Sequence, residues 1–145
     1  MLTAALAVGA VGVASPAVQI PAEAARLVLA WEIDHAPADR VLCIEVAANN
    51  PTPVLLTQLQ RKDRTVVPAS ECRLVMNVRL GSYYLKTKQK ANFLAVWNPK
   101  WRSASSLELE AEEYHHGLYA VHWTVELILQ NGRWEIANTR EDWIS

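Results

Sequence analysis

The clearest alternation of apolar and polar side chains lies near the C-terminal end of the chain. Six apolar residues recur there at every second position: Tyr119, Val121, Trp123, Val125, Leu127 and Leu129. A period of two is typical of a strand with one buried face. Asn131 and Gly132 follow, and Asn-Gly favours a two-residue type I′ turn. The pattern therefore predicts a hairpin in which Leu129 lies opposite Trp134 and Leu127 lies opposite Ile136.

Two helices are predicted before this hairpin. The first follows Pro21, and its apolar residues have the i, i+3, i+4, i+7 spacing of one helix face: Ala24, Leu27, Val28 and Trp31. It should end before Pro37, because the residue preceding a proline avoids helical backbone angles. The second should begin at Pro53 with Thr52 as its cap. Its leucines are expected to face the core: Leu55, Leu56 and Leu59.

The remaining chain shows strand and loop patterns. Residues 40–46 are a short apolar, β-branched run that is typical of a buried strand, whereas residues 63–70 are expected to form a loop. Further strands are predicted at residues 73–80, 82–87, 91–98 and 106–114. The predicted fold class is α+β: two N-terminal helices and a short strand packed on a curled antiparallel sheet that ends in the C-terminal hairpin. Residues 18–145 are expected to form one domain.

Charged residues are distributed unevenly along this predicted sheet. Glu108, Glu110 and Glu112 alternate with apolar residues, so all three should lie on the solvent face of one strand. The segment from Arg73 to Arg102 holds seven Lys and Arg and no acidic residue. Neighbouring strands of opposite charge would form cross-strand ion pairs. The net charge of the chain is only −1, which gives no general attraction for nucleic acid, and no nucleic-acid partner is expected.

Residues 1–17 contain no charged side chain and consist mainly of Ala, Val, Gly and Leu. Such a run, ending in small residues, is typical of a secretory signal peptide, although no Lys or Arg precedes it. A transmembrane anchor is the alternative, but the run is short for a hydrocarbon core of about 30 Å. We therefore expect residues 1–17 to be a cleaved signal peptide. The mature domain would be periplasmic or secreted, without stable membrane insertion.

Cys43 and Cys72 are the only two cysteines of the chain. In an exported protein an even number of cysteines indicates disulfide bonding, so these two are expected to form one bond. Two unpaired core thiols are the alternative. No second Cys or His lies at ligand spacing from either residue, so a zinc site is not expected.

The densest group of potential ligands or acid–base groups is the Glu-Glu-Tyr-His-His run at residues 112–116. His115 and His116 are adjacent, so on a strand they would point to opposite faces and could not share one metal ion. We interpret the run as a polar connection between strands, because no metal or catalytic motif has this spacing. His122 should lie on the face away from Trp123, as a solvated or sheet-surface histidine. No metal or cofactor is expected, and no nucleophile elbow or phosphate loop is present.

The run Asn-Gly-Arg-Trp-Glu-Ile at residues 131–136 resembles a Gly-x-Trp-x-Ile signature found in the last hairpins of the nuclear-transport-factor-like superfamily. The order helix, strand, helix and antiparallel strands is also similar to that superfamily. The resemblance implies a cone-shaped fold, whose enzymes place an Asp with a Tyr or His in the pocket. No residue set of this chain matches that pattern, so no catalytic role follows. Ala69–Cys72 and Trp143–Ser145 further resemble segments of small exported bacterial proteins of unassigned function.

The surplus of aromatic residues without a convergent nucleophile, base and oxyanion set favours a binding function. We expect an exported, non-enzymatic domain that binds a protein partner or a small apolar ligand on its aromatic-rich sheet. The candidate binding residues are Tyr84, Trp97, Trp101, Tyr114, His115 and His116. One alternative is a cone-fold enzyme of the isomerase or hydrolase kind that uses His115, His116 or a nearby glutamate. An inhibitor or immunity-type protein is another.

Overall fold

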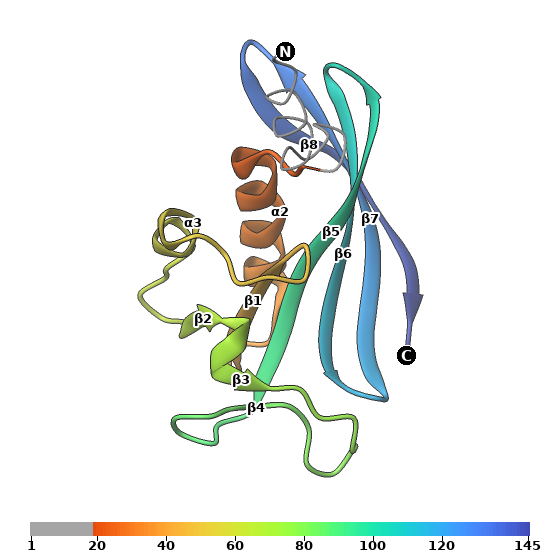
Figure 1. Cartoon of the computed structure of the whole chain (residues 1–145). Coiled ribbons are helices and arrows are strands. Elements are labelled where there is room, and N and C mark those ends of the chain that lie inside the picture. The colour runs from red at the N-terminus through yellow and green to blue at the C-terminus, as the bar shows by residue number, and fades with distance from the viewer. Residues whose placement is uncertain (1–18) are drawn as a thin grey trace, which may run out of the picture.

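A six-stranded sheet covered on one face by a long helix makes up most of the molecule (Figure 1). The computed structural model describes residues 19–145, so the predicted signal peptide lies outside the described residues. No helix in this described range is long and apolar enough to span a bilayer. The elements in chain order are α2 (Ala22–His35), β1 (Val41–Val46), α3 (Pro53–Gln58), β2 (Val66–Pro68), the 3₁₀ turn η2 (Ala69–Glu71), β3 (Cys72–Arg73), β4 (Tyr83–Tyr84), β5 (Ala91–Ser103), β6 (Ser106–His116), β7 (Tyr119–Gln130) and β8 (Arg133–Ile144).

The strand order β2-β1-β5-β6-β7-β8 confirms the α+β class and corrects the expected sheet. Strands β5 to β8 follow one another as antiparallel neighbours. Strand β1, however, pairs in parallel with both β2 and β5. The sheet is therefore mixed, and it is open with β2 and β8 at its edges instead of curled. The expected loop at residues 63–70 contains β2, which at three residues is too short to give a period.

Helix α2 packs on the sheet through a face turned by one residue from the predicted one. The predicted Ala24 and Val28 are buried, and so are Leu29 and Ile33, whereas the predicted Leu27 and Trp31 are only half-buried. The same rotation buries Glu32, which is 1% exposed. The helix ends at His35, as predicted.

Helix α3 confirms the predicted cap. The backbone N–H of Leu55 donates to the Thr52 hydroxyl oxygen at 3.2 Å. Leu55 and Leu59 are buried and Leu56 is half-buried, so the helix contributes its leucines to the core beside α2. A cap of this kind satisfies one backbone donor that the helix cannot pair internally.

The C-terminal hairpin has the predicted turn and register. Leu129 pairs with Trp134 and Leu127 with Ile136. Asn131 and Gly132 have φ angles of 53° and 77°, the positive values that a type I′ turn requires. The apolar face of β7 packs toward α2, with the Trp31 and Trp123 rings 5.0 Å apart in an edge-to-face arrangement.

The strands predicted at residues 73–80 and 82–87 are wrong for most of their length. Only Cys72–Arg73 and Tyr83–Tyr84 pair, and the rest forms two loops at one end of the molecule (Figure 1). Asn77 gives the physical reason, because its side-chain oxygen accepts the backbone N–H groups of Arg79 and Leu80. A side chain that bonds its own backbone favours a turn over a strand.

The predicted disulfide between Cys43 and Cys72 is confirmed. It joins β1 to β3 beneath a second, smaller apolar cluster that includes Tyr84, Phe93 and Val67. The bond therefore ties the start of the first loop to β1, the strand next to the β2 edge of the sheet.

Candidate functional site

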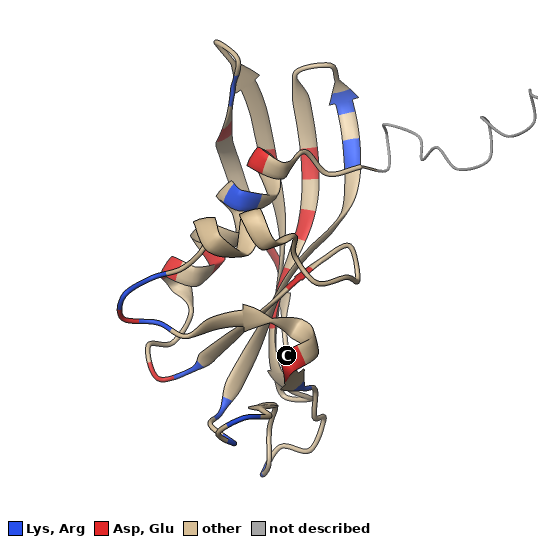
Figure 2. Ribbon diagram, turned by 60° about the vertical axis from the view of Figure 1, so that its left-hand side comes forward, with Lys and Arg blue, Asp and Glu red and all other residues tan. Residues whose placement is uncertain are grey.

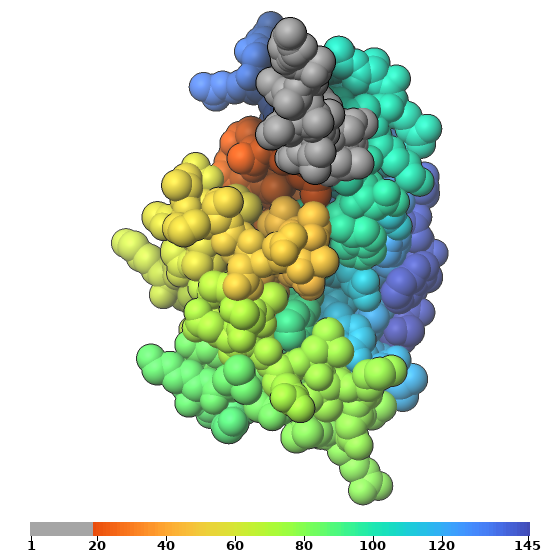
Figure 3. Space-filling model, viewed as in Figure 1, coloured from red at the N-terminus to blue at the C-terminus, as the bar shows by residue number. Residues whose placement is uncertain are grey.

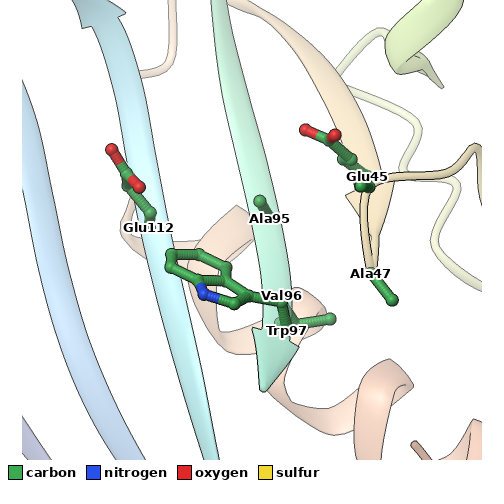
Figure 4. Close-up of a pocket in the computed structure, with 7 residues that line it drawn as sticks. Glu45, Ala47, Ala95, Val96, Trp97 and Glu112 are labelled. Carbon is green, nitrogen blue, oxygen red and sulfur yellow. The ribbon is translucent and has the colours of Figure 1, made fainter. Parts of the chain in front are cut away.

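The sheet face opposite α2 carries a hollow of about 440 Å³ (Figure 4). Its two acidic side chains come from neighbouring parts of the sheet, Glu45 from the end of β1 and Glu112 from β6. Ala95 of β5 is the cross-strand partner of both, and the Trp97 ring lies two residues further along β5 on the same face. The complete lining is Glu45, Ala47, Ala48, Ala95, Val96, Trp97 and Glu112.

A second hollow, of about 460 Å³, adjoins the first, and the two share Glu45 and Ala48. It is more apolar on the side of Phe93 and Leu74, and its polar residues come from the loops after β1 and β2. Its lining is Glu45, Ala48, Asn49, Asn50, Ala69, Ser70, Leu74 and Phe93. The two hollows together border Glu45 on both sides, so one elongated ligand could contact both.

Both hollows are bordered by a turn with unfavourable backbone angles. Ala47 and Ala48 have φ angles of 48° and 65°. Val46 and Asn49 hold this turn closed, because each donates its N–H to the other's carbonyl oxygen, at 2.8 and 3.0 Å. The left-handed region costs an ordinary residue roughly 1–2 kcal/mol. The surrounding sheet therefore stabilises a strained turn where it borders the hollows.

The charge of the first hollow is negative. Burial raises the pKa of Glu112, and the nearby Glu45 carboxylate raises it further, whereas His122 lowers it. Neither hollow is lined by a Lys or Arg. The two carboxylates therefore lack a cation within the lining that would neutralise them.

His122 lies beside the hollow in a network that sequence reasoning did not find. Its Nδ1 atom is 2.8 Å from Asp142 Oδ2 and its Nε2 atom is 3.1 Å from Glu110 Oε1. The ring stacks on Trp143 with centroids 5.3 Å apart and meets the edge of Trp97 at 5.5 Å. His122 lies on the predicted face of β7, away from Trp123, but these neighbours leave it only 7% exposed, so it is a covered residue of the sheet surface and not a solvated one.

The network also fixes the Asp142 carboxylate. Thr124 and Arg140 both donate to it, at 2.6 and 2.9 Å. The hydrogen bond from Thr124, more than those from Arg140 and His122, lowers the pKa of Asp142. An ionised carboxylate next to the ring holds His122 in one orientation, and with it the stacked Trp143.

The six candidate residues named from the sequence lie in separate places. Trp97 lines the first hollow, but Trp101 is on the opposite face, where its ring contacts Trp134 at 5.6 Å. Tyr84 is buried in the second apolar cluster, and Tyr114 packs beside it and donates to the Val75 carbonyl at 3.4 Å. His115 and His116 lie at the end of β6, away from Trp97 along the strand.

His115 is buried and hydrogen-bonded within the protein. Its Nδ1 atom is 2.8 Å from the Ala91 carbonyl oxygen, and burial lowers its pKa, so the neutral ring donates this hydrogen bond. His116 is adjacent, with ring centroids 5.1 Å apart. Within residues 19–145, no group of three or more His, Cys, Asp or Glu is placed to hold a metal ion.

Three comparisons were made with known proteins. No family model, curated protein or solved structure matches the chain.

Two buried carboxyl groups on the helix side of the sheet were also missed. Burial raises the pKa of Glu32 well above its usual range, and the Glu113 charge adds to the effect. Glu113 accepts hydrogen bonds from Asn92 and, at 3.1 Å, from Tyr119, yet burial still raises its pKa. The hollows described above are lined by neither residue. One signal in the sequence could have indicated the burial of Glu113: the period of two along β6 places it on the same face as Leu109 and Ala111.

Proposed function

We propose that the protein is an exported binding domain whose open sheet face takes a positively charged group on an apolar stem. The observation that carries the proposal is that the Trp97 ring shares one hollow with the Glu45 and Glu112 carboxylates, and that this hollow is lined by no Lys or Arg. The charged group is a protonated amine or a guanidinium, on a small molecule or on a Lys or Arg side chain of a protein partner.

The chemistry of the lining favours such a group in two ways. A cation over an indole face gains roughly 0.5–2 kcal/mol, depending on how far it is desolvated. A cation also removes the repulsion between Glu45 and Glu112 that raises the pKa of Glu112. The adjoining hollow offers Phe93 and Leu74 to the apolar part of the ligand.

The hydrogen bonds of His122 support binding in preference to catalysis. A general base needs a free nitrogen that faces the substrate. Both ring nitrogens of His122 face carboxylates, Asp142 and Glu110. The His122 ring thus packs against Trp97 and Trp143, and neither of its nitrogens is free to bind a ligand.

Export is part of the proposal. The Cys43–Cys72 bond supports an oxidising compartment, because disulfides persist outside the reducing cytosol. The uncharged run at residues 1–17 supports the same location.

A second candidate function, an enzyme acting by proton transfer, is favoured by one observation. Glu113 is a buried carboxyl group of raised pKa that accepts a hydrogen bond from Tyr119. Groups of this kind are frequent at active sites. An enzyme of the nuclear-transport-factor-like superfamily would fit this candidate. This second candidate function requires that a substrate can reach Glu113.

The test is a titration followed by the indole N–H signal of Trp97 in an NMR spectrum. The probes are Nα-acetyl-lysine amide, its Nε-acetylated and therefore uncharged analogue, and a hexapeptide that contains one lysine. We expect the charged probes to shift the Trp97 signal and the uncharged one to leave it unchanged. A shift with the peptide alone would indicate a protein partner, whereas a shift with both charged probes would indicate that the amine suffices.

Variants locate the site. Trp97→Ala and Glu112→Gln should each weaken binding by roughly tenfold, since each removes an interaction with the cation. Binding to Trp97→Ala is measured by calorimetry, because this variant lacks the indole that reports in the NMR titration. Glu126→Gln is the matched control, because Glu126 is exposed on β7 and does not line the hollow. Equal binding of the charged and uncharged probes, or no binding of either charged probe, would contradict the proposal. A shift at Tyr119 instead would favour the second candidate.

A further inference from the structure

One end of the molecule exposes a cluster of large apolar side chains. They come from the two loops around β3 and β4 and from the β6–β7 turn. Met76 is 73% exposed and Leu118 is 68% exposed. Figure 3 shows these loops protruding beyond the body of the molecule at its lower end. We call this group the apolar tip: Leu74, Met76, Val78, Leu80, Leu85 and Leu118.

The apolar tip is held in place by specific contacts. The Met76 carbonyl accepts the N–H of Gly117 at 3.0 Å, which joins the first loop to the β6–β7 turn. The N–H of Gly81 bonds to the Asn77 carbonyl at 2.8 Å, and the Ser82 hydroxyl accepts the N–H of Val75 at 3.0 Å. The structure thus fixes a backbone that projects its apolar side chains outward, where they would normally be unfavourable in water.

Basic side chains predominate around the apolar tip, although the exposed Glu71 adjoins it at Leu85. No Asp or Glu occurs between residues 73 and 102, and Figure 2 shows Lys and Arg along the lower loops. Lys88 lies 5.2 Å from the centre of the Tyr83 ring, in a hollow of about 270 Å³ that Leu80 and Lys90 complete. The exposed cations of this end are Arg73, Arg79, Lys86, Lys88 and Lys90.

We propose that the apolar tip docks the protein on an anionic lipid surface. A convex end that combines apolar side chains with lysines is the pattern of a peripheral membrane site, in which the apolar atoms enter the acyl boundary and the cations meet lipid phosphates. The apolar side chains lie on protruding loops, so a flat bilayer surface can cover them and no cleft of complementary shape is needed. The domain then lies on the bilayer without crossing it. This inference is independent of the hollow beside Trp97.

The test is co-sedimentation of the folded protein with vesicles of phosphatidylcholine alone or with 30% phosphatidylglycerol. We expect binding to the anionic vesicles only, weakening as salt is raised. The double variant Lys86→Gln/Lys88→Gln should bind roughly 20- to 30-fold more weakly, about fivefold for each lysine removed. Lys62→Gln/Lys100→Gln is the matched control, because both lysines are exposed but lie outside the apolar tip, and it should bind like the wild type.

The apolar contribution needs its own measurement. An environment-sensitive dye on Val78→Cys should shift to the blue with anionic vesicles, whereas the same dye on Val54→Cys, an exposed position on α3, should not. Far-ultraviolet circular dichroism of each variant checks folding. Absence of binding to either vesicle, binding that the lysine variants do not change, or equal dye responses at the two positions would overturn the proposal. Binding to an acidic protein without vesicle binding would replace lipid by a protein partner.

Discussion

Glu32 is the residue whose environment departs furthest from the sequence pattern. It is buried on the sheet-facing side of α2, and neither carboxylate oxygen has a hydrogen-bond partner within residues 19–145. A carboxylate without such partners is costly in an apolar site, so the neutral acid is favoured. Glu113 and Glu112 disfavour the charged form as well. Glu32 therefore holds its proton at pH values where an exposed glutamate has lost it.

This predicts a specific pH dependence of stability. In the unfolded chain Glu32 releases its proton near pH 4.3, whereas the folded chain keeps it to higher pH. The folded state then binds more protons, so the free energy of unfolding falls as pH rises above that value toward the raised pKa of Glu32. Glu32→Gln should flatten this decline and be more stable than the wild type at pH 8, as measured by urea unfolding. Glu113 has the same sign, so some decline remains.

Glu23 provides the control on the same helix. The hydrogen bond from Arg26 lowers the pKa of Glu23, so its contribution is present above the unfolded value and is lost as pH falls. Glu23→Gln should therefore leave the decline at higher pH unchanged. A Glu32→Gln variant that parallels the wild type across this range would contradict the prediction.

For single residues, the sequence correctly predicted the cysteine pairing but not the rotation of α2 about its axis. The Cys43–Cys72 bond followed from compartment and number alone. An offset of one residue, however, rotates the buried face of α2 by 100° about the helix axis and brings Glu32 into the core. The spacing of apolar residues in α2 does not define the buried face to within that angle. His122 was misjudged because Trp143, which covers it, is placed by a bulge in the pairing of β7 with β8.

At the scale of elements, two turns with positive φ angles can be compared. Ala47–Ala48 and Asn131–Gly132 both have left-handed angles, but only the second contains residues that accept them readily. Ala48→Gly should stabilise the protein by up to about 1 kcal/mol, because relief of strain exceeds the entropy that glycine loses. Thermal and urea unfolding measure this change.

The opposite substitution is the control. A Cβ added at Gly132 would meet no atom within 4 Å, so Gly132→Ala tests backbone strain alone. It should destabilise by roughly 1 kcal/mol. If both substitutions destabilised the protein, the strain assigned to the Ala47–Ala48 turn would be absent.

Elements were predictable where local pattern decides them. The hairpin, the Thr52 cap and the alternation along β6 involve neighbours in sequence, and all are confirmed. The parallel pairing of β1 with β5 joins residues 41–46 to residues 91–96, and no local pattern reports it. The loops at residues 74–82 look strand-like because Leu74, Met76, Val78 and Leu80 alternate, yet these side chains face solvent instead of a core.

At the scale of the whole molecule, the disulfide holds the apolar tip to the sheet. Cys43 is fully buried in β1, and Cys72 begins the segment that leads into the first loop. The bond closes a separation of 29 residues. Cys43→Ala/Cys72→Ala should lower the free energy of unfolding by about 3–4 kcal/mol in the chain-entropy model.

The same double variant separates global from local effects. Hydrogen exchange at Val75 and Gly81, whose N–H groups are hydrogen-bonded in the first loop, should accelerate more than exchange in β6, because the loop loses its covalent anchor. Equal acceleration in both regions would mean that the bond stabilises the domain as a whole and does not hold the tip in particular.

The parallel pairing of β1 with β5 also bears on the order of assembly. Strands β5 to β8 close through short turns, so they can form early, whereas α2 and β1 must wait for partners far along the chain. Helix α2 and strand β1, which precede the antiparallel strands in the chain, are thus among the last elements to dock. The apolar face of α2 emerges before Trp123 is synthesised, and during that interval it is available to a chaperone or a translocation channel. A chain organised in this way cannot complete its sheet and its helix packing until its last third has been synthesised.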